Sequence, residues 1–175
     1  MRRLADAQGV RRFMEALACQ ASGDARAYFT GGATAVLIGW RETTIDVDIK
    51  LVPERDEILR AIPRLKENLE INVELASPGD FIPELPDWQS RSVFIATQGR
   101  LSFYHYDFYA QTLAKIERGH ARDREDVREL IARDLVEPQR VLSLFGEIEP
   151  QLYRYPAIDP RSFRHAVEQT VKSRS

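Results

Sequence analysis

Residues 27–51 read AYFTGGATAVLIGWRETTIDVDIKL, and this stretch decides the fold. Its first four residues are mostly apolar and run into Gly31-Gly32, which predicts a short buried strand followed by a tight turn. The apolar run 33–38, which ends at a glycine, predicts a small helix. Residues 44–51 then alternate aliphatic or β-branched side chains with polar ones, the pattern of a half-buried strand. Strand, glycine turn, helix and strand in this order predict a mixed α/β unit.

The flanking sequence extends this unit. Apolar residues at helical spacing, alternating stretches and glycine or proline clusters mark its further elements. These are helices over residues 5–21 and 53–66, a strand over 71–75, a proline-rich ordered loop over 77–88, and a hairpin of strands 92–98 and 101–105. We therefore expect an α/β core over residues 1–106, built on a mixed sheet that is flanked by helices.

The pattern changes after Asp107, where helical spacing replaces alternation. Pro138 and Pro160 stand near the first turns of two of the predicted helices, a position that proline favours. The helices are expected over residues 107–118, 122–135, 138–152 and 160–173. Residues 107–175 are thus predicted to form a helical C-terminal part that packs on the core.

Composition excludes several classes of protein. The chain has 25 basic and 27 acidic residues, a formal net charge of −2, and a single cysteine, Cys19. One cysteine forms no intramolecular disulfide, and no short Cys/His spacing of a zinc site occurs. Without a basic excess, we expect weak RNA binding, confined to a terminal segment near Arg41, Arg118 and Arg122. The opening residues lack a long apolar stretch, so we expect no signal peptide, no membrane span and a cytoplasmic protein.

Asp46 and Asp48 are at positions i and i+2 of the predicted strand 44–51. The strand period places both carboxylates on one face, about 7 Å apart, and directs Ile45, Val47 and the next aliphatic residues to the core. Like charges on one face repel each other unless a cation lies between them, and Mg²⁺ takes one or two carboxylates plus substrate phosphates. The pair therefore predicts a metal site. The alternative is an edge strand with a solvated acidic face.

The glycine turn strengthens the metal-site interpretation. Gly31-Gly32 lies between a predicted strand and a predicted helix, with thirteen residues between Gly32 and Asp46. Glycines there let the backbone approach a ligand closely, and the N–H groups of a helix N-terminus attract phosphate. The combination indicates a phosphate cradle followed by a metal clamp.

This arrangement, Thr30-Gly31-Gly32 followed by Asp46-Val47-Asp48-Ile49, resembles the signature of the polymerase-β-like nucleotidyltransferase superfamily. The wider stretch 31–49 is similar to the minimal prokaryotic branch of that superfamily, which contains AbiEii-type toxins. Residues 113–118, with their central Lys115, and the later Arg122-Asp123-Arg124-Glu125-Asp126 are similar to the Lys and the Arg-Asp-x-x-Asp motif of the AbiEii branch. The resembling motifs cover roughly residues 28–130.

The resemblance implies roles for the core residues. The glycine motif would contact nucleotide phosphates, and Asp46 and Asp48 would bind Mg²⁺. Many members have Gly-Ser in place of Gly31-Gly32, so Thr34 is the candidate to supply the missing hydroxyl. A neighbouring strand often adds a third carboxylate, here Glu74, for which the alternative is an ordinary exposed side chain.

The resemblance also implies roles in the helical part. Lys115 would bind the triphosphate as a compact cation, and Asp126 or Asp123 would help to place the metal or the attacking hydroxyl. The alternative is a salt bridge between two helices with Asp123 at a helix N-terminus, which is the favoured interpretation of Asp123. The predicted nucleotide-binding residues are Gly31, Gly32, Thr34, Arg41 and Lys115. The predicted catalytic residues are Asp46, Asp48, Glu74, Lys115 and Asp126, and the first three are the predicted metal ligands.

The expected function is transfer of a nucleoside monophosphate from a nucleoside triphosphate (NTP) to a hydroxyl on an RNA 3′ end, a protein or a small molecule. The resemblance also implies a toxin that acts on tRNA ends and is restrained by a cognate antitoxin. The alternative is a catalytically silent module with the same fold that binds a nucleotide or a protein.

Other conspicuous residues predict packing. Tyr104, Tyr106, Phe108 and Tyr109 are expected to dock the hairpin on a helix, with base stacking as the alternative. The two nearby histidines are expected at the surface because neither has a carboxylate partner at a suitable spacing; they are His105 and His120.

Overall fold

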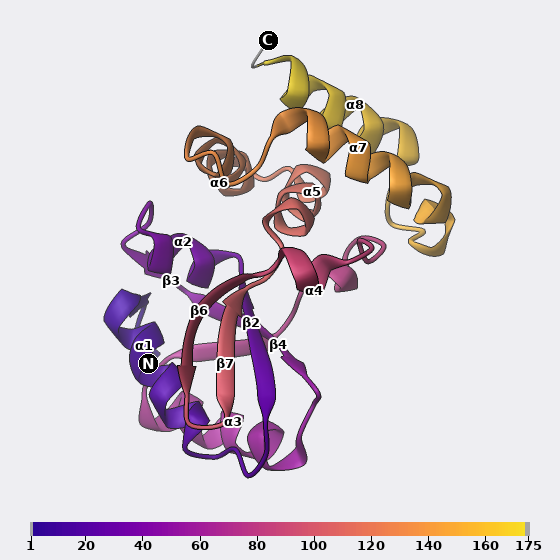
Figure 1. Ribbon diagram of the computed structural model, residues 1–175. Coiled ribbons are helices and arrows are strands. Elements are labelled where there is room, and N and C mark those ends of the chain that lie inside the picture. Colours follow the sequence, from indigo (N-terminus) through magenta and orange to yellow (C-terminus); the bar gives the residue numbers. More distant parts are fainter. Residues whose placement is uncertain (1, 174–175) are drawn as a thin grey trace. The chain divides into compact units, whose positions relative to one another are not determined.

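The computed structural model describes residues 2–173 (Figure 1). The chain forms two compact units. The first unit comprises Met1–Ser77 and Ser92–Tyr106, and the second comprises Pro78–Arg91 and Asp107–Ser175. The proline-rich segment that the sequence placed within the α/β part thus groups with the helical part.

The first unit contains a five-stranded mixed sheet, which confirms the predicted fold class. Its strands are β2 (Ala25–Thr30), β4 (Asp46–Val52), β5 (Asn72–Leu75), β6 (Val93–Gln98) and β7 (Leu101–His105), in the order β5-β4-β2-β7-β6 (Figure 1). β2 pairs antiparallel with β4 and parallel with β7, and β4 pairs parallel with β5. β6 and β7 form the predicted hairpin through Gly99-Arg100. The central strand β2 therefore ends directly beside β4, where the glycine turn begins.

One face of this sheet packs against helices. α1 (Ala7–Ala18) and α3 (Asp56–Asn68) contribute apolar residues to a core that also holds Val47, Ile49 and Phe29 from the sheet. The short helix α2 (Gly32–Ile38) follows β2, and a two-stranded ribbon pairs β1 (Ala5–Asp6) with β3 (Thr43–Thr44). The strand residues between the core positions, including Asp46 and Asp48, point to the opposite face.

Two expectations about burial in this unit are wrong. Ile45 is 58% exposed, because β3 ends at Thr44 and β4 begins at Asp46, so Ile45 lies in a bend outside the alternating stretch. His105 is buried instead of lying at the surface. It is the last residue of β7 and shares the core face with Phe29, its partner on β2.

The second unit is helical. Its helices are α4 (Trp88–Arg91), α5 (Phe108–Arg118), α6 (Ala121–Ala132), α7 (Pro138–Ile148) and α8 (Pro160–Lys172), with 3-10 segments at Pro78–Asp80 and Glu149–Arg154. α5 packs against α6, α7 and α8, and the rings of Phe145 and Phe163 meet edge to face between α7 and α8. Arg91 forms an ion pair with the buried Asp107, and the Tyr155 hydroxyl donates to the carbonyl of Gly79. These two contacts bind the proline-rich segment to the helices.

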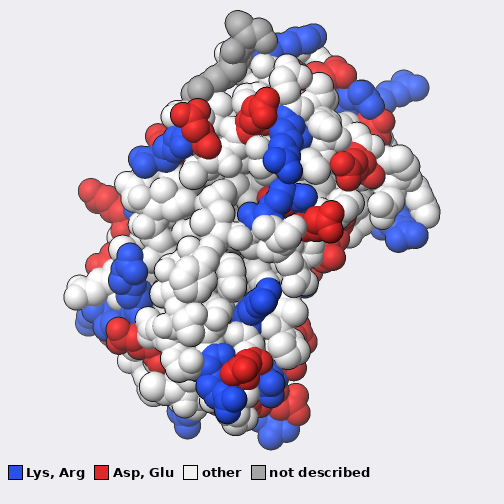
Figure 2. All heavy atoms as spheres, viewed as in Figure 1, with Lys and Arg blue, Asp and Glu red and all other residues white. Residues whose placement is uncertain are grey.

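Charges of both signs are mixed over the surface. On the face that Figure 2 shows, Lys and Arg side chains alternate with Asp and Glu. Within residues 2–173, no helix combines the length and the apolar character that a membrane span needs.

Candidate functional site

Asp46 and Asp48 lie on β4 with the geometry that the sequence predicts. Both are half-buried, whereas Val47 between them is fully buried. In the sheet register Asp46 lies opposite Asn72 and Asp48 lies opposite Glu74, both on β5. Directly paired residues point to the same face of a sheet, so β4 and β5 place three carboxylates on one face.

The Asn72 amide links two of these carboxylates. Its Nδ2 donates to Asp46 Oδ1 at 2.5 Å and to Glu74 Oε1 at 3.1 Å. Asn72 Oδ1 in turn accepts a hydrogen bond from Arg2. A neutral amide between two carboxylates fixes their positions without cancelling their charge. Sequence reasoning missed this role, although Asn72 alternates with Glu74 on the same predicted strand.

Gly31 brings the backbone against the Asp48 carboxylate. Gly31 has a φ of 62°, and a Cβ at this position would lie 3.3 Å from Asp48 Oδ2. A side chain here would be strained and would crowd that oxygen. The turn thus leaves open backbone directly beside a carboxylate of β4.

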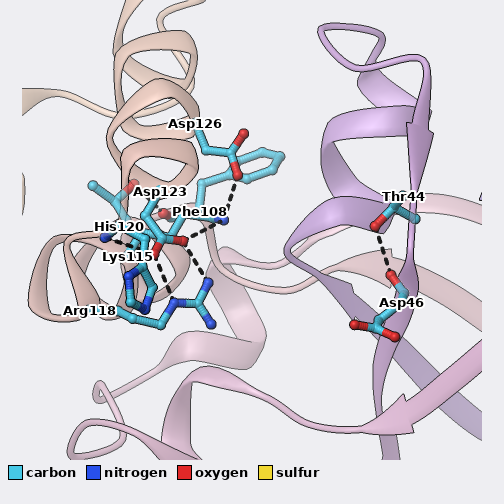
Figure 3. Close-up of polar contacts among 9 residues, drawn as sticks. Thr44, Asp46, Phe108, Lys115, Arg118, His120, Asp123 and Asp126 are labelled. Carbon is cyan, nitrogen blue, oxygen red and sulfur yellow. Dashed lines mark hydrogen bonds and ion pairs between the residues drawn. The ribbon is translucent and has the colours of Figure 1, made fainter.

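Gly32 is required for a different reason. A Cβ at Gly32 would lie 1.9 Å from Thr44 Oγ1 and 2.7 Å from Thr44 Cβ, and rotation of the Thr44 side chain cannot relieve the second contact. Thr44 also donates from Oγ1 to the carbonyl oxygen of Asp46 at 2.9 Å (Figure 3). Thr44 therefore connects the glycine turn to the start of the acidic strand, a contact that the sequence did not reveal.

Arg41 places a positive charge at the same turn. Its Nη1 would lie 3.3 Å from a Cβ built on Gly32. Arg41 also lines a hollow of about 600 Å³ together with Trp40, Glu42 and Gln8. Clefts of this volume are typical of small-ligand sites. A guanidinium beside a glycine backbone is suited to phosphate, and phosphate binding by Arg41 stays a prediction.

Thr34 does not lie where a phosphate-binding hydroxyl would. It is 1% exposed, and its Oγ1 donates to the carbonyl of Phe29 at 3.3 Å. The same oxygen is hydrogen-bonded to His105 Nδ1 at 3.1 Å. Burial lowers the pKa of His105 to about 4, so the ring is neutral at pH 7. The pair anchors α2 to the sheet from within the core.

The donor set on β4 is compatible with Mg²⁺. This ion prefers oxygen ligands and commonly takes one or two carboxylates, with water and phosphate oxygens completing its shell. Asp46 and Asp48 supply two such carboxylates on one accessible face, with Gly31 adding no side chain above them. Within residues 2–173, no three His, Cys, Asp or Glu side chains converge as a ready-made metal site. A metal held here would depend on phosphate oxygens for further ligands.

The second unit holds a separate, closed cluster of charges (Figure 3). Lys115 Nζ on α5 lies 2.7 Å from Asp126 Oδ2 and 3.7 Å from Asp123 Oδ1, both on α6. Arg118 donates to both carboxylate oxygens of Asp123, at 2.9 and 2.6 Å. Asp123 also accepts from the backbone N–H of His120 at the start of α6. The predicted salt bridge between two helices, with Asp123 in a helix cap, is confirmed.

Burial makes this cluster tight. The side chains of Lys115, Asp126 and Asp123 are 8%, 2% and 4% exposed. Burial by itself raises the pKa of Asp123, but the guanidinium of Arg118 and the ammonium of Lys115 outweigh it and lower that pKa overall. The cluster holds α5 to α6, and the role of Lys115 and Asp126 in a reaction stays a prediction.

The aromatic residues pack, but the ring contacts of Tyr104 and Tyr106 are with a tyrosine of strand β2, whereas docking on a helix was expected. In the first unit Tyr104 stacks on Tyr28 at 5.3 Å between ring centroids, and Tyr106 meets Tyr28 edge to face. In the second unit Phe108 is buried at the start of α5, and Tyr109 accepts the backbone N–H of Glu137. These contacts account for the cluster as packing within each unit.

A family model described as "Nucleotidyltransferase of unknown function (DUF6036)" matches residues 12–171. No curated protein and no solved structure matches the chain. The match spans both units and contains every residue of the β4 site.

Proposed function

From the premise that this chain belongs to the family of nucleotidyltransferases of unknown function, we propose that it moves a nucleoside monophosphate from an NTP to a hydroxyl acceptor. In this reaction the acceptor oxygen forms a bond to the α-phosphorus. The bond from that phosphorus to the bridging oxygen of pyrophosphate breaks, and pyrophosphate leaves with the electron pair. The proton of the acceptor hydroxyl passes to solvent.

One observation carries the proposal: the Asp48 carboxylate lies against the backbone of Gly31, which has no side chain, and the Arg41 guanidinium lies at the neighbouring Gly32. Carboxylates for a divalent cation, open backbone for phosphate and a cation for phosphate charge are the three components that phosphoryl transfer uses most. All three occur here within one turn and one strand of the first unit.

Each residue has a physical task in this reaction. Asp46 and Asp48 would hold Mg²⁺ against the triphosphate, and Glu74 is the third candidate ligand because it lies opposite Asp48 in the sheet. Mg²⁺, when bound, lowers the pKa of the acceptor hydroxyl and neutralises phosphate charge. Gly31 and Gly32 admit the phosphates to the backbone, and Arg41 binds their negative charge. Asn72 fixes the Asp46 carboxylate through its amide.

The resemblance to AbiEii-type toxins supplies the finer part of the proposal. It suggests a toxin role, a tRNA end or a protein as acceptor, and a cognate antitoxin. It also suggests that Lys115 and Asp126 act on the triphosphate or the acceptor. The site on β4 supports the transfer chemistry independently of these points.

The test is to incubate the protein with Mg²⁺ and each α-labelled NTP in turn, with total tRNA or with a protein extract. We expect Mg²⁺-dependent label on one acceptor together with pyrophosphate release, and loss of both in Asp48→Asn. Label on tRNA identifies an RNA-modifying enzyme, and label on a polypeptide identifies a protein-modifying one. MgNTP binding without transfer to any acceptor, small alcohols included, would overturn the proposed reaction and favour the silent binding module.

A further inference from the structure

The second unit contains a groove in which Lys115 is the one lining residue that the proposed reaction also names. It has a volume of about 490 Å³ and is lined by residues of α5, α6 and α8 and by residues at the ends of these helices. α5 packs against both neighbours, so α5 forms the floor and the other two helices form the walls. Sites for small organic ligands typically have volumes of about 300–1,000 Å³. The groove therefore has the size of a site for a small organic molecule.

The floor and lower walls of this groove are apolar. They consist of Ile116 on α5, Val127 and Ile131 on α6, and Ala166 on α8. These side chains are buried or half-buried in the absence of any ligand. An apolar body placed on them would be removed from water, with a gain of about 25 cal/mol for each Å² of apolar surface buried.

The charged residues of the groove are all basic, although the chain as a whole has more acidic residues than basic ones. Lys115 is neutralised by its ion pair with Asp126, whereas Arg124 and Arg128 stand one helical turn apart on the exposed side of α6. Arg124 donates to the carbonyl of Gly119, which fixes its guanidinium at the end of α5. Among residues 2–173, Arg128 has no acidic partner and no hydrogen bond of its side chain.

The opposite wall is polar and uncharged. Thr170 and Ser173 on the α8 side donate their hydroxyl protons to backbone carbonyls, those of Ala166 and Thr170. Gln169 is exposed at the same edge and carries an amide group with two N–H donors. This edge therefore has a neutral donor opposite the two arginines.

We propose that this groove binds a small organic anion that has one carboxylate or phosphate head and an apolar body. The apolar body would lie on Ile116, Val127 and Ile131, and the head would pair with Arg128, the arginine without an internal partner. Arg binds carboxylate and phosphate through two parallel hydrogen bonds, which favours an anionic head over a neutral one.

The first test uses decanoate as the probe, with decanol and acetate as controls. We expect decanoate to bind the full chain with one saturable site by calorimetry. Decanol should bind at least about tenfold more weakly because it lacks the charge, and acetate should give no saturable signal because it lacks the apolar body. Equal affinity for decanoate and decanol, or no saturable binding of decanoate, would overturn the proposal.

Two variants locate the site. Arg128→Gln should weaken decanoate binding about tenfold and leave decanol binding unchanged. Arg133→Gln is the matched control, because Arg133 caps the C-terminus of the same helix but is paired with Glu129 outside the groove. Ala166→Trp should fill the groove and abolish binding, with circular dichroism as the check on folding. Unchanged decanoate affinity in Arg128→Gln would overturn the proposal even if Ala166→Trp proves unstable.

Discussion

Two pairs of aspartates, one in each unit, show opposite uses of the same residue. Asp46 and Asp48 stand two residues apart on a strand, and Asp123 and Asp126 stand three apart on a helix, so each pair occupies one face of its element. The strand pair is half-buried and faces away from the core. The helix pair is buried against α5.

The partners of the two pairs explain the difference. Asp126 and Asp123 are neutralised by Lys115 and Arg118, as a buried carboxylate requires. Asp46 instead accepts its hydrogen bond from the neutral amide of Asn72, which also bridges to Glu74. The partner of the Asp46 carboxylate is thus a neutral amide, which leaves the charge of this carboxylate in place, whereas the α6 pair is neutralised by cations of the chain itself.

The largest effect is expected on β4. Asp46→Asn and Asp48→Asn should each lower pyrophosphate release by about 1,000-fold, which corresponds to about 4 kcal/mol in the activation free energy. Calorimetry should show that both variants lose Mg²⁺-dependent binding of ATP and GTP. The free energy of unfolding should change by less than about 0.5 kcal/mol because both side chains face away from the core.

Asp56→Asn serves as the control for these variants. Asp56 lies in the same unit in the first turn of α3, and its side chain is 82% exposed. It should keep wild-type activity and nucleotide binding. Wild-type affinity for MgATP in both β4 variants would show that Asp46 and Asp48 do not bind the metal. The proposed difference in use between the two aspartate pairs would then be wrong.

The next effect is on stability. Lys115→Met should lower the free energy of unfolding by about 3–4 kcal/mol, because it leaves Asp126 buried without its cation. Urea denaturation measures this change. Adding Asp126→Leu to Lys115→Met should restore most of the loss, since two apolar side chains can replace a buried ion pair.

The matched control for Lys115 is Arg133→Met, which breaks the exposed pair with Glu129 and should lower the free energy of unfolding by no more than about 0.5 kcal/mol.

Lys115→Arg separates the structural role of Lys115 from its predicted catalytic one. If Lys115 binds the triphosphate, Lys115→Arg should reduce pyrophosphate release substantially, because a planar fork replaces a compact ammonium. Wild-type release in both Lys115→Arg and Lys115→Ala would leave Lys115 with a structural role alone.

Much of the fold could be predicted because periodicity is a local property. The alternation in residues 44–51 identified β4, and Val10, Phe13 and Leu17 at helical spacing identified α1. Pairing of Asp46 and Asp48 on one face followed from the same period. These predictions needed only neighbours in the sequence.

Long-range contacts explain what the sequence did not show. Thr34 became a core residue because His105, 71 positions away, meets its hydroxyl. The segment Pro78–Arg91 joined the helices because Tyr155 holds Gly79 and Asp107 holds Arg91. No pattern within a short stretch of sequence encodes such partners. Spacing therefore identified the acidic residues but not the groups that contact or neutralise them.

His105 is a buried titratable group whose hydrogen-bond partner, Thr34, is neutral, in contrast to the buried aspartates of α6. Its pKa of about 4 in the folded protein lies below the ordinary value of 6.5, so the unfolded chain takes up a proton first as the pH falls. Stability should therefore decrease from about pH 6.5 down to pH 4, by about 3 kcal/mol in total, and this group should add no further loss below pH 4.

Urea unfolding of wild type and His105→Gln at pH 7, 5.5 and 4.5 isolates this contribution. The carboxylates titrate in both proteins, so their contribution cancels when the free energy of unfolding of one protein is subtracted from that of the other at each pH. As the pH falls, the free energy of unfolding of the wild type should decrease more than that of His105→Gln. Parallel curves would show that His105 is not held neutral in the core.

Gly31→Ala should reduce nucleotide binding less than the β4 aspartate variants do, and it is the most specific test of the glycine turn. Gly31 combines a φ of 62° with a ψ of −128°, a conformation outside the left-handed helical region that costs an L-residue about 1–3 kcal/mol, and the new Cβ would lie 3.3 Å from Asp48 Oδ2. Gly99→Ala is the matched control: Gly99 has a φ of 55°, and its Cβ would meet only the Ala18 carbonyl at 3.7 Å. Both variants should lose stability in urea, but only Gly31→Ala should lose MgNTP affinity, by about tenfold. Equal nucleotide affinity in the two variants would mean that the backbone beside Asp48 does not receive phosphate, and that the acidic face of β4 acts without the glycine turn.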